Sequence, residues 1–135
     1  MSFRVIIVGA AGVFGSRLAE QLARLGEYDI VLAGRDAAKA VPILARGIGS
    51  RFVVFDRNRS DIAVLRGLAP DVLVDAAGPF QASGSALPEA CIAAGIHYID
   101  IADARDFVGG IARLDEKAKA ANVAVISGAS STPAL

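Results

Sequence analysis

Short runs of apolar, mostly β-branched residues alternate with longer segments rich in alanine and leucine along the whole chain. The apolar runs predict strands at 4–8, 29–33, 51–55, 71–75, 97–100 and 123–127. All but 97–100 are nearly continuous in apolar residues and do not alternate with polar ones. Such runs are typical of parallel strands that are covered on both faces of a sheet.

The segments between the strands predict helices at 13–25, 37–46, 60–68, 83–94 and 106–121. The first helix places four apolar side chains on one stripe at helical spacing: Phe14, Leu18, Leu22 and Leu25. Asp36 and Ser60 are candidate N-caps of the second and third helices, and Gly95 is a candidate stop for the fourth.

Strict alternation of strands and helices predicts right-handed crossovers and a doubly wound α/β fold. We therefore expect a parallel six-stranded Rossmann sheet of order 3-2-1-4-5-6 with helices on both faces. Nothing in the chain resembles a linker, a low-complexity tract or an internal repeat, so one domain is expected to fill residues 1–135.

Composition narrows the class of protein. The chain is 54% hydrophobic, and its 14 basic residues balance its 14 acidic ones, which predicts a globular protein without attraction to nucleic acid or a membrane surface. A lone Cys91 excludes an internal disulfide and fits a reducing compartment. The apolar run before the first glycine is shorter than a secretory signal core, so a cytoplasmic protein is expected.

The sequence GAAGVFG follows the first predicted strand and opens the first helix, which is the position of a dinucleotide-binding loop. Gly9 permits the tight turn, Gly12 admits a pyrophosphate, and Gly15 allows close packing of helix on sheet. The spacing is G-x-x-G-x-x-G, as in extended or atypical reductase-type Rossmann domains. The loop backbone is expected to contact phosphate at Ala10, Ala11, Val13 and Phe14, and the alternative is an ordinary turn.

The second predicted strand ends in LAGRD, which places Gly34 and Arg35 where an NAD site would carry an acidic residue. A guanidinium can bind a 2′-phosphate through two charge-assisted hydrogen bonds. Asp36 would repel a phosphate, but it is expected to cap the following helix. NADP is therefore favoured over NAD, and the alternative for Arg35 is a solvent-facing loop residue.

Two further segments follow the third and fourth predicted strands. Asp56 is placed to accept the exocyclic amine of adenine and Arg57 to lie over the ring; the alternative is a turn aspartate beside solvated arginines. In the DAAGPF segment, Ala76, Ala77 and Gly78 leave no bulk beside the ribose and nicotinamide. Pro79 stiffens the turn, and Phe80 is expected to form a wall of the nicotinamide pocket. An aromatic residue in the core is the alternative for the last of these.

Candidate catalytic groups are scarce. His97, the only histidine, falls at the amino end of its strand, which favours a structural role. Asp100 and Asp103 could face a substrate or cap a helix. Neither Tyr28 nor Tyr98 has a lysine four residues later, so the acid–base pair of classical short-chain reductases is missing. There is also no zinc-ligand spacing, no G-K-[ST] phosphate loop and no nucleophile elbow. The sequence predicts a cofactor site with no metal and no identifiable catalytic group.

The segments VIIVGAAGVFGSRLAEQLA, VLAGRD, VLVDAAGPFQASGSALPEACIAAGIHYIDIAD and VAVISGASSTPAL together resemble the N-terminal NADP-binding domain of saccharopine dehydrogenase-like reductases. The resemblance implies pyrophosphate binding at Gly9, Gly12 and Gly15, with the 2′-phosphate at Arg35. It also implies adenine near Asp56, and ribose and nicotinamide near residues 77–80. In that family an α/β substrate and dimerisation domain follows, and hydride transfer reduces an imine C=N bond.

The chain ends where that family would continue, at a Thr132-Pro133 pair that resembles the start of a helix. We therefore expect part of a longer NADP-dependent oxidoreductase with a small-molecule substrate, inactive alone and dimeric through its missing domain; a natural short protein is the alternative. A non-catalytic NADP(H) sensor or partner-binding module is a second hypothesis. A methyltransferase is a third, and Arg35 counts against it.

Overall fold

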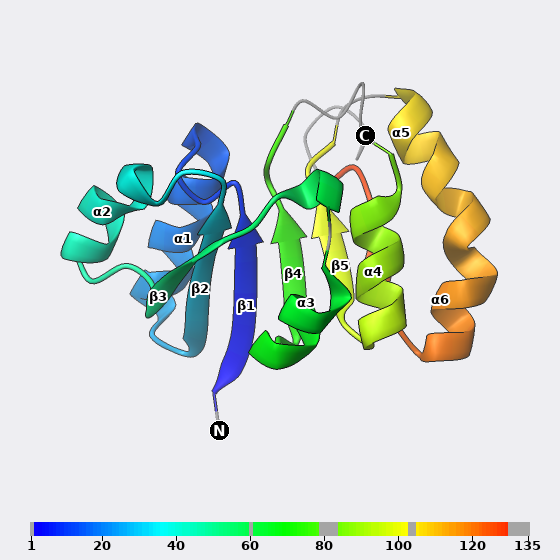
Figure 1. The fold of residues 1–135 in the computed structure, drawn as a ribbon, viewed down its shortest axis with the longest axis horizontal. Helices are drawn as coiled ribbons and strands as arrows, with labels where there is room; N and C mark the ends of the chain where they lie inside the picture. The colour runs from blue at the N-terminus through cyan, green and yellow to red at the C-terminus, as the bar shows by residue number, and fades with distance from the viewer. Residues whose placement is uncertain (1, 60, 79–83, 103–104, 130–135) are drawn as a thin grey trace.

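A computed structural model shows six parallel strands in the order β3-β2-β1-β4-β5-β6, which confirms the predicted Rossmann sheet (Figure 1). The structure describes residues 2–59, 61–78, 84–102 and 105–129. The strands are β1 (Phe3–Val8), β2 (Tyr28–Gly34), β3 (Arg51–Val54), β4 (Val72–Asp75), β5 (His97–Asp100) and β6 (Val125–Ile126).

Helices connect successive strands and cover both faces of the sheet. The α-helices are α1 (Val13–Leu25), α2 (Ala37–Ala45), α3 (Ile62–Leu68), α4 (Ala86–Ala94), α5 (Arg105–Gly110) and α6 (Asp115–Ala121). Two short 3₁₀ segments are η1 (Arg57–Arg59) and η2 (Ile111–Leu114). Figure 1 shows α3 and α4 in front of the sheet and α1 behind it, with α6 beside α4.

The two faces of β1 build two separate apolar clusters. Ile6 and Val8 pack with residues of α3 and α4, among them the fully buried Leu65. Val5 and Ile7 point to the opposite face and pack with residues of α1 and α2. This division follows from the two-residue period of a strand, and it explains why the predicted strands are apolar at consecutive positions.

Several element boundaries differ from the predicted ones, and three differences are the most informative. The third helix is capped by Asp61, whose carboxylate accepts hydrogen bonds from the N–H groups of Ala63 and Val64. The helix predicted at 106–121 is divided into α5, η2 and α6, because the adjacent Gly109 and Gly110 weaken helix propensity there. The last strand is shorter than predicted and spans only Val125–Ile126.

Two end signals are confirmed. Asp36 is the N-cap of α2 and accepts a hydrogen bond from the Ala38 N–H, and Gly95 ends α4 with a φ of 73°. Within the described residues no helix is both long and apolar enough to cross a membrane.

Candidate functional site: a cleft at the carboxyl edge of the sheet

A cleft lies at the carboxyl ends of the strands, where open α/β sheets bind their ligands. Its volume is about 800 Å³, which lies within the range of small-molecule and cofactor sites. Segments that follow four different strands line it: Val8, Gly9, Ala11, Gly12, Gly34, Arg35, Asp36, Lys39, Phe52, Phe55, Asp56, Arg57, Asn58, Ala76, Ala77 and Gly78.

The glycine loop is built from close backbone contacts that leave no room for side chains. Gly9 has a φ of +78°, and a methyl group there would lie 2.8 Å from the Ala77 Cα. A methyl group on Gly15 would lie 2.2 Å from the Gly9 carbonyl oxygen. Gly9 therefore lets the loop approach the segment after β4, and Gly15 lets α1 pack onto the loop.

The backbone donors of this loop divide into two groups. The N–H groups of Gly9 and Ala10 both donate to the Ala33 carbonyl, and that of Gly12 donates to the Gly9 carbonyl. Ala10 is thus fixed to the neighbouring strand and does not offer its N–H to a ligand. Gly12 is the N-cap of α1 and carries no side chain that could cap it. The first-turn N–H groups of α1, at Val13 and beyond, are therefore placed to bind an anion.

The start of α2 supplies positive charge at one end of the cleft. Arg35 and Lys39 are both exposed and both line the cleft. Asp36 lies between them in sequence, but its Oδ1 accepts the Ala38 N–H and so caps the helix. The arrangement provides two cations for an anionic group such as a 2′-phosphate. Lys39 was not predicted from the sequence, because it lies inside the helix and not in the segment directly after the strand.

The segment after β3 forms the next part of the cleft wall. Asp56 is half-buried, and its Oδ1 accepts the Asn58 N–H at 2.9 Å. This interaction tightens the turn that begins η1. Asp56 lines the cleft, where its other carboxylate oxygen is available to a ligand, so an adenine contact remains a prediction.

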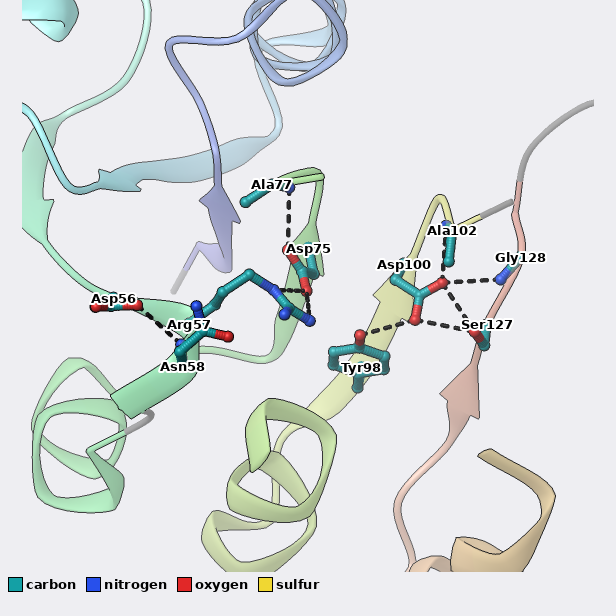
Figure 2. A network of polar contacts seen from close by, with 10 residues as sticks. All are labelled: Asp56, Arg57, Asn58, Asp75, Ala77, Tyr98, Asp100, Ala102, Ser127 and Gly128. Carbon is teal, nitrogen blue, oxygen red and sulfur yellow. Dashed lines mark hydrogen bonds and ion pairs between the residues drawn. The ribbon is translucent and has the colours of Figure 1, made fainter. Parts of the chain in front are cut away.

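Arg57 is not solvated, so the alternative is wrong for this arginine, although Asp56 does act as a turn aspartate. It is only 8% exposed, and its Nε and a terminal guanidinium nitrogen lie 2.8 and 2.7 Å from the Asp75 Oδ2 (Figure 2). The Phe107 ring lies 6.0 Å from the centre of the guanidinium. The guanidinium is therefore directed to the end of β4, not out over a ligand.

Asp75 is completely buried at the end of β4. Its Oδ1 accepts the Ala77 N–H at 3.0 Å, so both carboxylate oxygens are hydrogen-bonded. Burial raises the pKa of this carboxyl above its ordinary value, and the Arg57 guanidinium opposes that shift. Burial of the Asp75 carboxylate costs desolvation free energy, and attraction to the Arg57 guanidinium offsets part of that penalty.

Asp100 occupies the position on β5 directly beside Asp75 and belongs to a second network. It accepts hydrogen bonds from Tyr98, Ala102, Ser127 and Gly128, as Figure 2 shows. Burial also raises the pKa of the Tyr98 hydroxyl, so this group stays a hydrogen-bond donor. The network ties the chain after β6 to the end of β5 and is structural.

The cleft brings together nine of the residues predicted from the sequence: Gly9, Ala11, Gly12, Gly34, Arg35, Asp56, Ala76, Ala77 and Gly78. Gly15 is buried beneath the loop, while Val13 and Phe14 have exposed side chains outside the cleft lining. Pro79, Phe80 and Asp103 lie outside the described residues. His97 accepts the Ala124 N–H through Nδ1, which is a structural contact.

This combination of parallel sheet, glycine loop and carboxyl-edge cleft defines a dinucleotide-binding Rossmann domain. Residues 5–126 match the family described as the saccharopine dehydrogenase NADP binding domain, and the chain belongs to that family. Its cofactor is accordingly NADP. The loop geometry fits this cofactor, because methyl groups at Gly9 or Gly15 would collide with backbone atoms that shape the cradle.

Individual proteins are also similar to this chain. A Mycobacterium tuberculosis protein named as a trans-acting enoyl reductase is 33% identical over 104 residues, which are 73% of this chain and 25% of that protein. Saccharopine dehydrogenase (L-Glu forming) from Saccharomyces cerevisiae has a TM-score of 0.74 and 18% identity, over 95% of this chain and 27% of that one. Triphenylmethane reductase from Citrobacter sp., complexed with NADP(H), has a TM-score of 0.63 and 17% identity. The match covers 91% of this chain and 48% of that one.

The chain therefore spans about a quarter of the length of the mycobacterial protein and of the yeast enzyme. The described residues contain no group of three or more histidine, cysteine or acidic side chains that could hold a metal ion.

Proposed function

We propose that this chain is the cofactor-binding part of an NADP(H)-dependent oxidoreductase whose substrate-binding and dimerisation domain follows it. The observation that carries the proposal is the cleft at the carboxyl edge, which is lined by the glycine cradle and by the cations Arg35 and Lys39. The cofactor, when bound, supplies hydride chemistry, and the chain binds and orients it.

In this proposal each part of the cleft has one role. The loop from Gly9 to Gly12 and the first turn of α1 bind the pyrophosphate. Arg35 and Lys39 bind the 2′-phosphate, and Asp56 contacts the adenine. The segment Ala76–Gly78 borders the ribose and nicotinamide, with Pro79 and Phe80 continuing it.

The hydride acceptor is proposed to be an imine C=N bond, as in saccharopine dehydrogenase, and the setting is proposed to be cytoplasmic. The mycobacterial relative, named as an enoyl reductase, favours a second candidate, an activated C=C bond. An activity assay distinguishes the two acceptors. It uses a protein that contains this chain and a following domain. NADPH is added together with either an amine and a keto acid, or an enoyl thioester. If NADPH is not oxidised in the presence of either substrate, the result favours the non-catalytic sensor.

The cofactor assignment predicts that the chain binds NADPH more tightly than NADH, and that Arg35→Ala removes most of the difference. Loss of a charged hydrogen-bonded contact costs about 1–3 kcal/mol of binding free energy. Arg35→Ala combined with Lys39→Ala should remove what preference remains. Isothermal titration calorimetry of the parent and both variants with NADPH and NADH measures all six affinities.

Arg113→Ala is the matched control, because Arg113 is an exposed arginine on η2 outside the cleft. It should leave the preference for NADPH unchanged. Equal affinity of the parent chain for NADPH and NADH would contradict the role of Arg35 and Lys39.

A further inference from the structure

Two walls of the cleft come from segments whose strands are not neighbours in the sheet. The segment 56–58 follows β3 at one edge of the sheet, and the segment 76–78 follows β4. In the sheet order, β2 and β1 stand between these strands, so no ladder hydrogen bond connects them. A direct link between the two walls is therefore made by side chains, in addition to the strands that lie between them.

The Arg57–Asp75 ion pair spans that separation. Arg57 lies in the first wall, next to Asp56, and its guanidinium reaches the Asp75 Oδ2 at the base of the second wall. The Asp75 Oδ1 holds the Ala77 N–H, and Ala77 in turn touches the Gly9 loop. Figure 2 shows Arg57, Asp75 and Ala77 in this continuous series, separate from the Asp100 network.

Stability alone does not account for such a pair. A buried ion pair is often no more stabilising than apolar residues of similar size, because desolvation offsets the attraction between the charges. Asp75 is completely buried and Arg57 nearly so, yet both line or support the cleft. The Nε–H hydrogen bond to the Asp75 Oδ2, with a terminal nitrogen in ion-pair contact with the same oxygen, instead gives a defined distance and direction.

We propose that Arg57 is a positioning residue for NADP(H), and that its ion pair with Asp75 holds the adenosine wall and the nicotinamide wall of the cleft at the separation the dinucleotide requires. This inference rests on the proposed cofactor binding. Its consequence is selective: a ligand that contacts both walls gains from their fixed separation, whereas a ligand that contacts one wall does not.

The test compares NADPH with 2′,5′-ADP, which carries only the adenosine half and the 2′-phosphate. Two variants weaken the link differently: Arg57→Lys keeps the charge but loses the Nε–H donor, and Arg57→Met with Asp75→Asn removes both charges. An asparagine retains an oxygen for the Ala77 N–H, so neither variant leaves an unpaired buried charge. We expect NADPH affinity to fall about tenfold in both, with 2′,5′-ADP affinity changed less than about twofold.

The matched control is Arg4→Met with Asp29→Asn. Arg4 on β1 and Asp29 on β2 form an ion pair with an Nε–Oδ2 distance of 2.7 Å near the amino ends of the strands, remote from the cleft. This control should lower the thermal midpoint without changing either affinity. A parent chain that does not bind NADPH would overturn the proposed function. Parent binding of NADPH, with variants that lose both ligands equally or neither, would overturn only the positioning role.

Discussion

Gly15 and Gly67 are both glycines inside helices, but their surroundings are opposite. A methyl group on Gly15 would lie 2.2 Å from the Gly9 carbonyl oxygen and 2.9 Å from the Ala10 Cα. A methyl group on Gly67, in α3, would meet nothing within 4 Å. The first glycine is required by contact, whereas the second is only a weak helix former.

We therefore predict that Gly15→Ala destabilises the protein by about 1–3 kcal/mol, because packed backbone must move to admit the methyl group. Gly67→Ala should instead stabilise it by about 0.5–1 kcal/mol, because alanine loses less backbone entropy in a helix. Urea denaturation followed by circular dichroism gives both free energies of unfolding. Similar values for the two variants would contradict the close approach of α1 to the loop.

The same scale shows what the sequence can and cannot predict about the site. The glycines and Arg35 were predictable because each directly follows a strand, so local position fixes its place at the sheet edge. The burial of Arg57 was not, because its partner Asp75 is 18 residues later and on a non-adjacent strand. A motif of neighbouring residues carries no signal for such a pair.

At the scale of elements, continuous apolar runs predicted the strands well because parallel strands are buried on both faces. Helix ends were less predictable. Asp61 caps α3, although the preceding Ser60 is an equally good capping type in sequence. The break at η2 follows the adjacent Gly109 and Gly110, a local signal that the apolar periodicity of 106–121 does not record.

The two ends of the sheet should respond to pH with opposite signs. At the amino end, hydrogen bonding from Arg4 holds the pKa of Asp29 below its ordinary 3.8. Its contribution to stability is present above that value and lost as pH falls through the folded pKa. At the carboxyl end, burial raises the pKa of Asp75, so its protonated form favours the fold. That contribution is lost as pH rises from 3.8 through the folded pKa.

We predict that Asp29→Asn reduces the loss of stability that the parent shows as pH falls below 3.8. The double variant Arg57→Met with Asp75→Asn should show a smaller loss of stability than the parent as pH rises above 3.8. Thermal unfolding of the parent and both variants between about pH 3 and pH 7 measures the two slopes. A double variant whose profile matches that of the parent above pH 3.8 would contradict the raised pKa of Asp75.

At the scale of the whole molecule, the strand order followed from alternation and right-handed crossovers, and the structure confirms it. The same order places β1 and β4 side by side with their helices on opposite faces, which opens the crevice at the carboxyl edge. The residues that line the cleft are therefore a consequence of topology, whereas the ion pair that joins its walls is a consequence of tertiary packing.

Cys91 gives a direct measure of how cofactor binding stabilises this whole fold. It is completely buried in the cluster formed by β1, β4, α3 and α4, and burial raises the pKa of its thiol to about 12. We predict that a maleimide labels it only when the core opens. NADPH at about 100 times its dissociation constant should slow labelling about 100-fold, since it binds the folded state alone.

The control for this measurement is the chain in denaturant, where the single thiol should label fully at the same rate with or without NADPH. Labelling of the native chain that is slow but unaffected by bound NADPH would mean that α4 opens locally, without disturbing the cleft. In that case Cys91 would report the stability of one helix. A rate that follows cofactor concentration instead shows that the apolar cluster and the cleft above it unfold as one cooperative unit.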